Sequence, residues 1–450
     1  MPTAQPTRAL ARAAVFSMLA ACHTAAVAPA PRSALDDTAQ IRRDIVYLAS
    51  PALEGRLTGT PGNDTAAAYI ARLYDSLHLA QARPLITTGP RPQCPAIFIE
   101  GFICSPAYMQ RFLARSVAAA HAGLPGELPT QNVVAVIPGS DPALRHEYVM
   151  VGAHYDHLGR NAFNAMDPAA GDAIRPGADD NASGTAAVME LARLFAKRPT
   201  KRSIMLLNFS GEELGVLGSE YFVQNPPVPL DSAELYINFD MVGRLRDDKL
   251  IVYGVATATQ LKPLIDSLNA AVGHFALSAV GDGYGPSDQA SFYGAGVPVL
   301  YYFTDVHEDY HRATDVASKI NFVGEARVID FAAAAVRELG DRPGRLTFIA
   351  APPPKRTMGG SGAWFGSVPD MGAADVVGVR LAGVTAGSPA DKAGAMKGDI
   401  IVEFGGDTVK DIYDYSAALG KHKPGETVTV VVMRDGKRLT LTAVLGTRGS

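Results

Sequence analysis

Tyr148-Val-Met-Val-Gly-Ala-His154-Tyr-Asp156 joins an apolar run to two side chains of kinds that occur in metal sites. Residues 148–153 are rich in apolar and β-branched residues, which favours a buried strand. Side chains two positions apart in an extended segment share a face, so Asp156 can accept the second ring N–H of His154 and fix its tautomer. The alternative is that Asp156 is a solvated carboxylate in a loop. This segment predicts a strand that ends in a metal ligand.

Three later strands are expected to end in the same way. In open α/β sheets, ligands bind in the crevice at the carboxyl ends of the strands. A further acidic segment, Asp179-Asp180-Asn181, comes just before an expected helix at residues 184–196. Polar side chains at four strand ends and one helix start therefore predict a single site at one edge of the sheet. The three strands and the side chains after them are 203–209 with Glu212 and Glu213, 233–239 with Asp240, and 297–302 with Tyr310 and His311.

The order of the expected elements indicates an α/β fold. From residue 131 onward strands alternate with helices, which is typical of a sheet covered on both faces. We therefore predict a mixed, mostly parallel sheet with helices on both faces, in a domain at residues 36–345. Residues 81–130 are Pro-rich and are expected to form a short irregular insert. The other expected strands are 132–137 and 250–253, and the other expected helices are 64–79, 213–224 and 322–339.

Taken in order, the polar segments resemble the co-catalytic zinc aminopeptidase family, which includes secreted bacterial leucyl-type aminopeptidases, plasma carboxypeptidase and glutaminyl cyclase. The resemblance runs from roughly residue 53 to 339. It implies two zinc ions, and histidine with carboxylate and no thiolate suits that metal. The ligands it implies are His154 with Asp240 on one ion, Glu213 with His311 on the other, and Asp179 as the bridge.

The resemblance also implies roles in catalysis. A hydroxide that bridges the two zinc ions attacks the first peptide carbonyl, Glu212 accepts the proton, and the Tyr310 hydroxyl bonds the tetrahedral intermediate. Asp180 matches a family position that is often joined by a cis peptide bond. The alternatives are that Glu212 and Glu213 are only an acidic helix N-terminus, and that Tyr310 only packs beside the site.

Several polar neighbours of these segments receive no catalytic role. In Ser287-Asp288-Gln289, many relatives have histidine in the third place, and glutamine cannot act as a base. We expect the remaining polar residues of these loops to face solvent or to support the ligands; they are His157, His307, Glu308 and Asp309.

Aminopeptidases carry the strongest resemblance, so we predict a zinc-dependent exopeptidase that hydrolyses the N-terminal peptide bond of peptides. A carboxypeptidase or dipeptidase of the same family would use the same metals with a different substrate clamp. A glutaminyl cyclase should use one zinc and would not need the full bridging set. From another class, the chain could be a peptide-binding protein on an inactive peptidase scaffold.

The C-terminal part of the chain reads as a separate small module. Residues 346–362 have the Pro- and Gly-rich composition of a linker. Residues 363–447 resemble a bacterial-type PDZ domain, which implies capture of an extended peptide C-terminus or loop by strand addition. The peptide-binding loop would be Trp364-Phe365-Gly366-Ser367. The alternative is a domain that only packs on the peptidase.

The N-terminal residues read as an export signal. Arg8 and Arg12 precede a short apolar run at 13–21, and Leu19-Ala20-Ala21-Cys22 resembles a bacterial lipobox, in which the cysteine is lipidated. We therefore expect a signal peptide at 1–22, a tether at 23–35 and a periplasmic or cell-envelope protein held at the membrane only by lipid on Cys22. The alternative is an ordinary secretory signal that is cut nearby.

Bulk composition excludes some partners. The formal net charge of −4 over 450 residues gives no electrostatic footprint for nucleic acid. The longest apolar runs fall short of the ~20 residues that span a bilayer. In an oxidising compartment, Cys94 and Cys104 are expected to be structural and to form a loop-closing disulfide.

Overall fold

The structure is a computed structural model that describes residues 1, 33–82, 108–116, 120, 124–161, 164–350, 363–369, 376–385 and 387–447. The expected signal peptide with Cys22, the two other cysteines and most of the expected linker lie outside the described residues.

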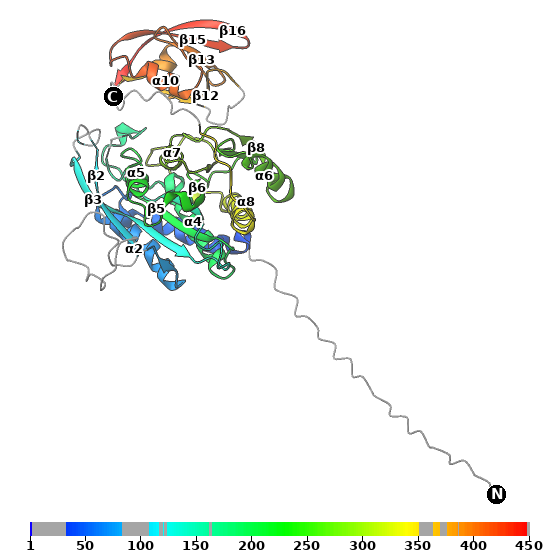
Figure 1. Cartoon of the computed structure of the whole chain (residues 1–450). Helices are drawn as coiled ribbons and strands as arrows, with labels where there is room; N and C mark the ends of the chain where they lie inside the picture. Colours follow the sequence, from blue (N-terminus) through cyan, green and yellow to red (C-terminus); the bar gives the residue numbers. More distant parts are fainter. Residues whose placement is uncertain are drawn as a thin grey trace. The chain divides into compact units, whose positions relative to one another are not determined.

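A nine-stranded mixed sheet forms the centre of the larger domain (Figure 1), as the sequence predicts. Its order is β1-β3-β5-β4-β6-β9-β7-β8, with β2 also paired to β3. The central pairs β5–β4, β4–β6 and β6–β9 are parallel, whereas β3 and β7 pair antiparallel with β5 and β9. The bounds are β1 Ala80–Gln81, β2 Met109–Arg115, β3 Glu127–Ile137, β4 Tyr148–His154, β5 Ser203–Phe209, β6 Ala233–Phe239, β7 Lys249–Tyr253, β8 Ala276–Ala279 and β9 Val299–Phe303.

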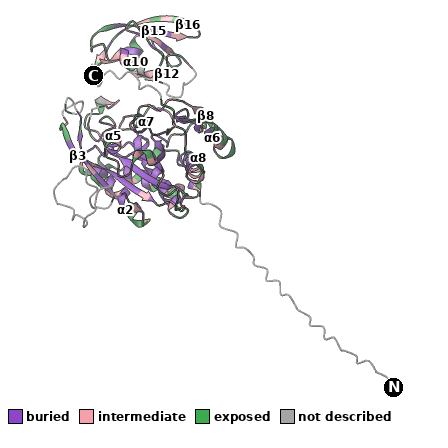
Figure 2. Cartoon of the chain, viewed as in Figure 1, coloured by how far each residue is buried: buried purple, intermediate pink, exposed green. Residues whose placement is uncertain are grey.

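Helices cover both faces of this sheet because successive strand residues point to opposite sides. In β4, Val149 and Val151 pack with α1, α2, α4, α6 and α8 in one core, whereas Met150 packs with α5 and α7 in a second core. Figure 2 shows the central strands as buried. The bounds are α1 Thr38–Leu48, α2 Pro61–Ser76, α4 Gly184–Ala196, α5 Leu217–Gln224, α6 Leu261–Leu268, α7 Gln289–Gly294 and α8 Phe322–Asp341.

Short helical turns complete this domain. One of them, η4 at Ala178–Ser183, carries the Asp-Asp-Asn segment and leads directly into α4. The others are η1 Ala34–Asp37, η2 Pro51–Leu53, η3 Pro168–Ala170, η5 Leu230–Ser232, η6 Asn269–Gly273 and η7 Ala317–Lys319. Within the part of the chain that the structure describes, no helix is long and apolar enough to cross a membrane.

The C-terminal module has its own sheet and its own core. Five strands follow the order β11-β12-β13-β15-β16, β14 pairs with β13, and β10 pairs with β17. Phe365, Leu381, Ile401 and Phe404 belong to a buried cluster made only of residues from this module. The bounds are β10 Ala363–Trp364, β11 Ser367–Pro369, β12 Val379–Val384, α9 Pro389–Lys392, β13 Ile400–Phe404, β14 Asp407–Thr408, α10 Ile412–Leu419, β15 Thr427–Arg434, β16 Lys437–Val444 and β17 Gly446–Thr447.

Two expected elements need correction. The region 81–130 is not wholly irregular, because it contains β2 and the first residues of β3. The helix expected from residue 213 begins only at Leu217. Gly211, Gly215 and Val216 have positive φ angles of 85°, 114° and 54°, which keep the chain in a turn before the helix starts.

Candidate metal centre

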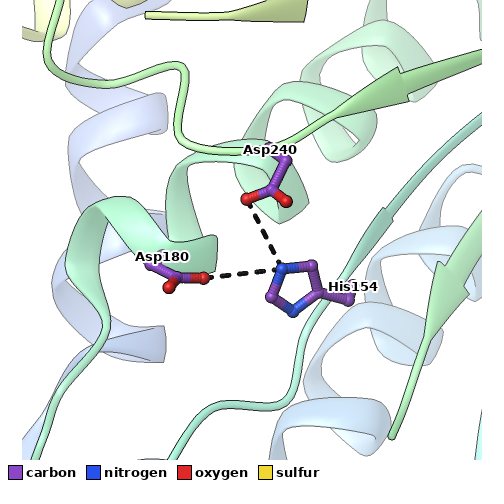
Figure 3. Close-up of side chains that lie close together, drawn as sticks. All are labelled: His154, Asp180 and Asp240. Atoms are coloured by element: carbon purple, nitrogen blue, oxygen red, sulfur yellow. Dashed lines mark ion pairs between the residues drawn. The ribbon is translucent and has the colours of Figure 1, made fainter. Parts of the chain in front are cut away.

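His154, Asp180 and Asp240 form the first half of a buried polar cluster (Figure 3). His154 ends β4, Asp240 follows β6, and Asp180 lies in η4, so three separate elements bring them together. The Nε2 atom of His154 is 3.5 Å from Oδ1 of Asp180 and 3.5 Å from Oδ1 of Asp240. All three residues are less than a tenth exposed.

Glu213 and His311 form the second half, on the other side of Asp180. The Nε2 atom of His311 is 3.2 Å from Oδ2 of Asp180 and 3.2 Å from Oε2 of Glu213. Glu213 follows β5, and His311 lies in the loop after β9. The two oxygens of Asp180 thus face different histidines, which is the geometry of a carboxylate shared between two metal sites.

Asp180, and not the expected Asp179, lies between the two histidines of the cluster. Oδ1 of Asp179 instead accepts hydrogen bonds from the backbone N–H of Gly243 at 2.7 Å and the hydroxyl of Ser183 at 3.0 Å. Its Oδ2 lies 3.1 Å from Nε2 of His307. Neighbouring residues of the turn point in different directions, so only one of the two carboxylates reaches the cluster. A cis peptide bond joins Asp180 to Asn181, which confirms the expectation for this position.

Both ligand histidines are oriented by their second ring nitrogen. Nδ1 of His311 donates to the carbonyl of Asn164 at 2.8 Å. Nδ1 of His154 lies 3.2 Å from the carbonyl oxygen of Asp156 and 3.6 Å from its carboxylate. Each ring therefore presents Nε2 to the cluster, as metal-binding histidines require.

Asp156 lies beside His154, where the sequence analysis placed it. Its carboxylate is fixed from two sides, because it accepts the Thr58 hydroxyl at 2.8 Å and the backbone N–H of Glu212 at 3.2 Å. The closer contact to the His154 ring is made by the Asp156 carbonyl. Asp156 thus links the end of β4 to the turn that carries the two glutamates.

The charges around the cluster favour bound cations. Burial lowers the pKa of His154, but Asp240 and Glu212 raise it, so the net pKa lies well above its ordinary value. Burial likewise opposes a charged His311, but Glu213 and Asp180 raise its pKa well above the usual range. A group of carboxylates that draws protons onto buried histidines also attracts metal ions at the same nitrogens.

The residues present fit zinc. The donors are histidine nitrogens and carboxylate oxygens, which suit this ion. Oδ1 of Asp240 is buried and accepts no hydrogen bond from any described residue, as expected of an oxygen reserved for a metal. A second possible ligand group joins His157 to Asp180 and Glu213.

Glu212 and Tyr310 border the open side of the cluster. Glu212 lines the same cleft as His154, Asp180 and Asp240. Burial raises the pKa of Glu212 well above its ordinary value, His154 lowers it and Glu213 raises it. The ring of Tyr310 stacks on the His311 ring with 3.8 Å between centroids. Apolar side chains of the same domain also line this cleft, and they include Met166, Met241, Tyr301 and Phe303.

Asp315 supports the site, although no role was predicted for it from the sequence. Oδ2 of Asp315 accepts the backbone N–H groups of both Asp179 and Asp180, at 2.9 and 3.1 Å. His157 and His307 are 0% and 8% exposed, so they support the site and do not face solvent. Their signal in the sequence was position alone, since each lies within a few residues of a ligand.

Gln289 is a buried glutamine, and its side chain cannot act as an acid or a base. Its side-chain oxygen accepts a hydrogen bond from Asn238 at 3.1 Å. It is fully buried at the first residue of α7.

In the C-terminal module, the expected peptide-binding loop joins β10 to β11. Phe365 is fully buried in the core of the module, and Trp364 is half-buried. The Ser367 and Tyr415 hydroxyls are 2.6 Å apart, which connects β11 to α10. β11 is the last strand of its sheet among the described residues, so its outer edge has backbone groups that an added strand could use.

Comparisons with known proteins agree with this architecture. Residues 132–336 match Peptidase family M28, and residues 357–445 match the PDZ domain. A probable zinc metalloprotease from Pyrenophora tritici-repentis is 40% identical over 126 residues, which are 28% of this chain and 24% of that protein. Leupeptin-inactivating enzyme 1 from Streptomyces exfoliatus is 28% identical over 308 residues, 62% of each protein. The chain thus spans less than two thirds of the length of these relatives.

Solved structures show the same fold. A Zn-dependent exopeptidase from Parabacteroides distasonis has a TM-score of 0.51 at 16% identity, over 68% of this chain and 98% of that one. Glutaminyl cyclase from Porphyromonas gingivalis also has a TM-score of 0.51, at 19% identity, over 68% of this chain and 99% of that one. These structures show the fold alone, whereas the family models indicate a peptidase family M28 domain at residues 132–336 followed by a PDZ domain at residues 357–445.

Proposed function

We propose that this protein is a zinc-dependent aminopeptidase that removes residues from the N-terminus of peptides. The observation that carries the proposal is the position of Asp180. One of its oxygens lies near His154 and the other near His311. Each of these histidines also lies near one further carboxylate, Asp240 for His154 and Glu213 for His311. One relative is named a probable zinc metalloprotease, and another is named Aminopeptidase YwaD from Bacillus subtilis.

Two zinc ions would be held in this cluster. His154, Asp240 and Asp180 would bind one ion, and Glu213, His311 and Asp180 would bind the other. When bound, such ions polarise a peptide carbonyl and make water a strong nucleophile near neutral pH. The remaining roles fall to side chains of this chain that border the cleft.

Glu212 is placed to move the proton. Its backbone N–H is held by Asp156, and its carboxylate lines the cleft beside the ligands. A carboxylate whose pKa is raised by burial accepts a proton from attacking water more readily than an exposed one, and the same group would then pass that proton to the leaving amine.

Tyr310 is placed to assist the reacting carbonyl. It borders the cleft, and its ring is fixed against His311. A phenol O–H directed at the carbonyl oxygen would donate a hydrogen bond that strengthens as negative charge develops there.

The cleft also favours a free amino group and an apolar first residue. Glu212, when ionised, provides negative charge, which attracts an ammonium group. Arg244, a cation in the same cleft, already donates to Asp309 at 3.0 Å. Met241, Tyr301 and Phe303 belong to one apolar cluster and also line the cleft, so leucine-like side chains would be preferred over charged ones.

Metal counting and turnover test this proposal together. We expect the full chain to bind two zinc ions and to hydrolyse aminoacyl-nitroanilides with a free α-amine, but not the same substrates with a blocked amine. Glu212→Gln should keep both metals and lose about 100-fold or more in kcat. Glu220→Gln on α5 is the matched control and should keep full activity. Turnover that needs a free carboxylate in place of a free amine would favour a carboxypeptidase.

We further propose that the PDZ domain binds peptide C-termini at the outer edge of β11, and that Cys22 is lipidated after export. Both follow from the sequence patterns, and neither depends on the metal site. Fluorescence titration of Trp364 with C-terminal peptides, against the same peptides amidated, tests the first. Metabolic labelling with palmitate in wild type and Cys22→Ser tests the second.

A further inference from the structure

His157 is a buried histidine beside the cluster that the proposed chemistry does not use. It is 0% exposed, and its Nδ1 lies 2.7 Å from Oε1 of Glu213. Two such atoms approach this closely only with a hydrogen between them, so Nδ1 of His157 donates to the carboxylate. The other oxygen of Glu213, Oε2, faces His311. One residue thus holds one oxygen of Glu213 and leaves the other for the metal side.

The surroundings of His157 distinguish it from the two ligand histidines. Both His154 and His311 have a second ring nitrogen held by a backbone carbonyl, as metal-binding histidines usually do. The second nitrogen of His157, Nε2, is buried and has no hydrogen-bond partner among the described residues. Its Nδ1 is also 3.8 Å from Asp180, farther than its 2.7 Å contact with Glu213. These contacts are those of a residue that donates a hydrogen bond to a metal ligand, and not those of a metal ligand itself.

The backbone around His157 keeps the ring in place. Gly177 packs so tightly against the ring that a Cβ added there would lie 2.5 Å from Cγ of His157. The backbone N–H of His157 donates to the carbonyl of Arg56 at 3.3 Å. Gly177 and Arg56 thus hold the ring and the backbone of His157 beside Glu213.

We propose that His157 is a positioning residue for the second metal site, which it serves by fixing the carboxylate of Glu213 so that Oε2 faces the ion. The proposal rests on the proposed two-metal function. It implies that loss of the hydrogen bond weakens the binding of one metal ion and spares the other, because the side-chain hydrogen bonds and ion pairs of His157 among the described residues go to Glu213 and Asp180 and not to His154 or Asp240. Supporting groups of this kind typically change metal affinity by about 10–100-fold.

Zinc titration of the full chain against a chromophoric chelator tests the proposal without measuring activity. Wild type should show two bound ions, and His157→Leu should retain both with one of them weakened by about 10–100-fold. His157→Asn should restore most of the affinity, because its side-chain N–H₂ stands near the place of Nδ1. His157→Gln, whose N–H₂ stands near the place of Nε2, should not. His146→Asn, an exposed histidine before β4, is the control.

Cobalt substitution separates a positioning residue from a ligand. If His157 positions Glu213, the visible spectrum of the Co²⁺ protein should keep its shape in His157→Asn. A changed spectrum or the loss of one ion in His157→Asn would make His157 a ligand and overturn the proposal. Unchanged affinity of both ions in His157→Leu would overturn it as well. Wild type that binds fewer than two ions would refute the two-metal function itself, which is a separate outcome.

Discussion

Adjacent carboxylates at residues 179 and 180 have different partners, and this difference decides how the metal centre is built. Asp180 stands between His154 and His311, whereas Asp179 bonds Ser183, Gly243 and His307. Asp315 holds the backbone of both residues through one oxygen. The sequence shows two equivalent aspartates, but the fold brings the two oxygens of only Asp180 to the histidines of the cluster.

Exchange of each carboxylate for an amide should separate the two roles. We expect Asp180→Asn to weaken both zinc ions, because a neutral amide cannot bridge two cations, and to reduce turnover by about 100-fold or more. Asp179→Asn should keep two ions, since its partners are an amide, a hydroxyl and His307. Metal content after dialysis and kcat for leucyl-nitroanilide check both variants. If Asp180→Asn binds both ions as tightly as wild type does, the bridging role would return to Asp179.

Protons should compete with zinc at the same histidines. The pKa values of His154 and His311 are raised above their usual range without metal, with burial opposing and the neighbouring carboxylates prevailing. The metal-free protein therefore keeps these protons to a higher pH than a free histidine with its pKa of about 6.5. Zinc affinity should rise with pH until those raised pKa values are passed and then level off. Competition titrations from about pH 5 to pH 9 check this, and a plateau already at pH 6 would contradict it.

Among the elements, the N-terminal turn after η2 supports the site although it lies outside the matched family region. Arg56 is fully buried and donates to four backbone carbonyls, those of Leu48, Tyr155, Pro176 and Gly177. It therefore ties the end of α1 and the end of β4 to the residues that enter η4. Thr58, two residues later, holds the carboxylate of Asp156.

Removal of this guanidinium should loosen the fold and the site together. Arg56→Met leaves four carbonyls without their donor, and each unmet buried group costs roughly 1–3 kcal/mol, so the free energy of unfolding should fall by at least about 3 kcal/mol. Urea unfolding followed by circular dichroism measures it. Arg43→Met, an exposed arginine on α1, is the matched control and should shift stability by less than about 0.5 kcal/mol. Equal, small effects in both variants would show that Arg56 does not tie these segments.

The accuracy with which the sequence predicts each helix or strand depends on whether local residues or distant contacts set its ends. The bounds of α4, β5 and β6 were predicted to the residue, because apolar periodicity and flanking polar residues mark both ends. The start of α5 was not, because Glu212 and Glu213 belong to a turn held by local glycines and by contact with Asp156. β2 was missed because its pairing with β3 is tertiary and leaves a weak pattern in the residues 109–115. The same limit hid Asp315 and left two readings open for His157, because the partners of both residues are distant in sequence.

At the scale of the whole molecule, the two domains have separate cores among the described residues. The buried cluster of the PDZ domain contains no residue of the peptidase domain, and the family matches end and begin on either side of residues 337–356. Separate cores joined by a linker unfold as separate units unless their interface is large. The metal centre belongs to one unit and the expected peptide-binding loop to the other.

Zinc removal and a substitution in the PDZ core should therefore act on two different unfolding transitions of the full chain. Zinc removal should lower only the unfolding midpoint of the peptidase domain, because a ligand stabilises the domain that binds it. Phe404→Ala should lower only the free energy of unfolding of the PDZ domain, by about 3–5 kcal/mol, since Phe404 is fully buried against Phe365 and Tyr415. Trp364 is the only tryptophan of the chain, so its fluorescence reports the PDZ transition while circular dichroism reports both. Val377→Ala, an exposed position of the same domain, should move neither. A single transition that responds to both chelator and Phe404→Ala would mean that the two domains unfold together.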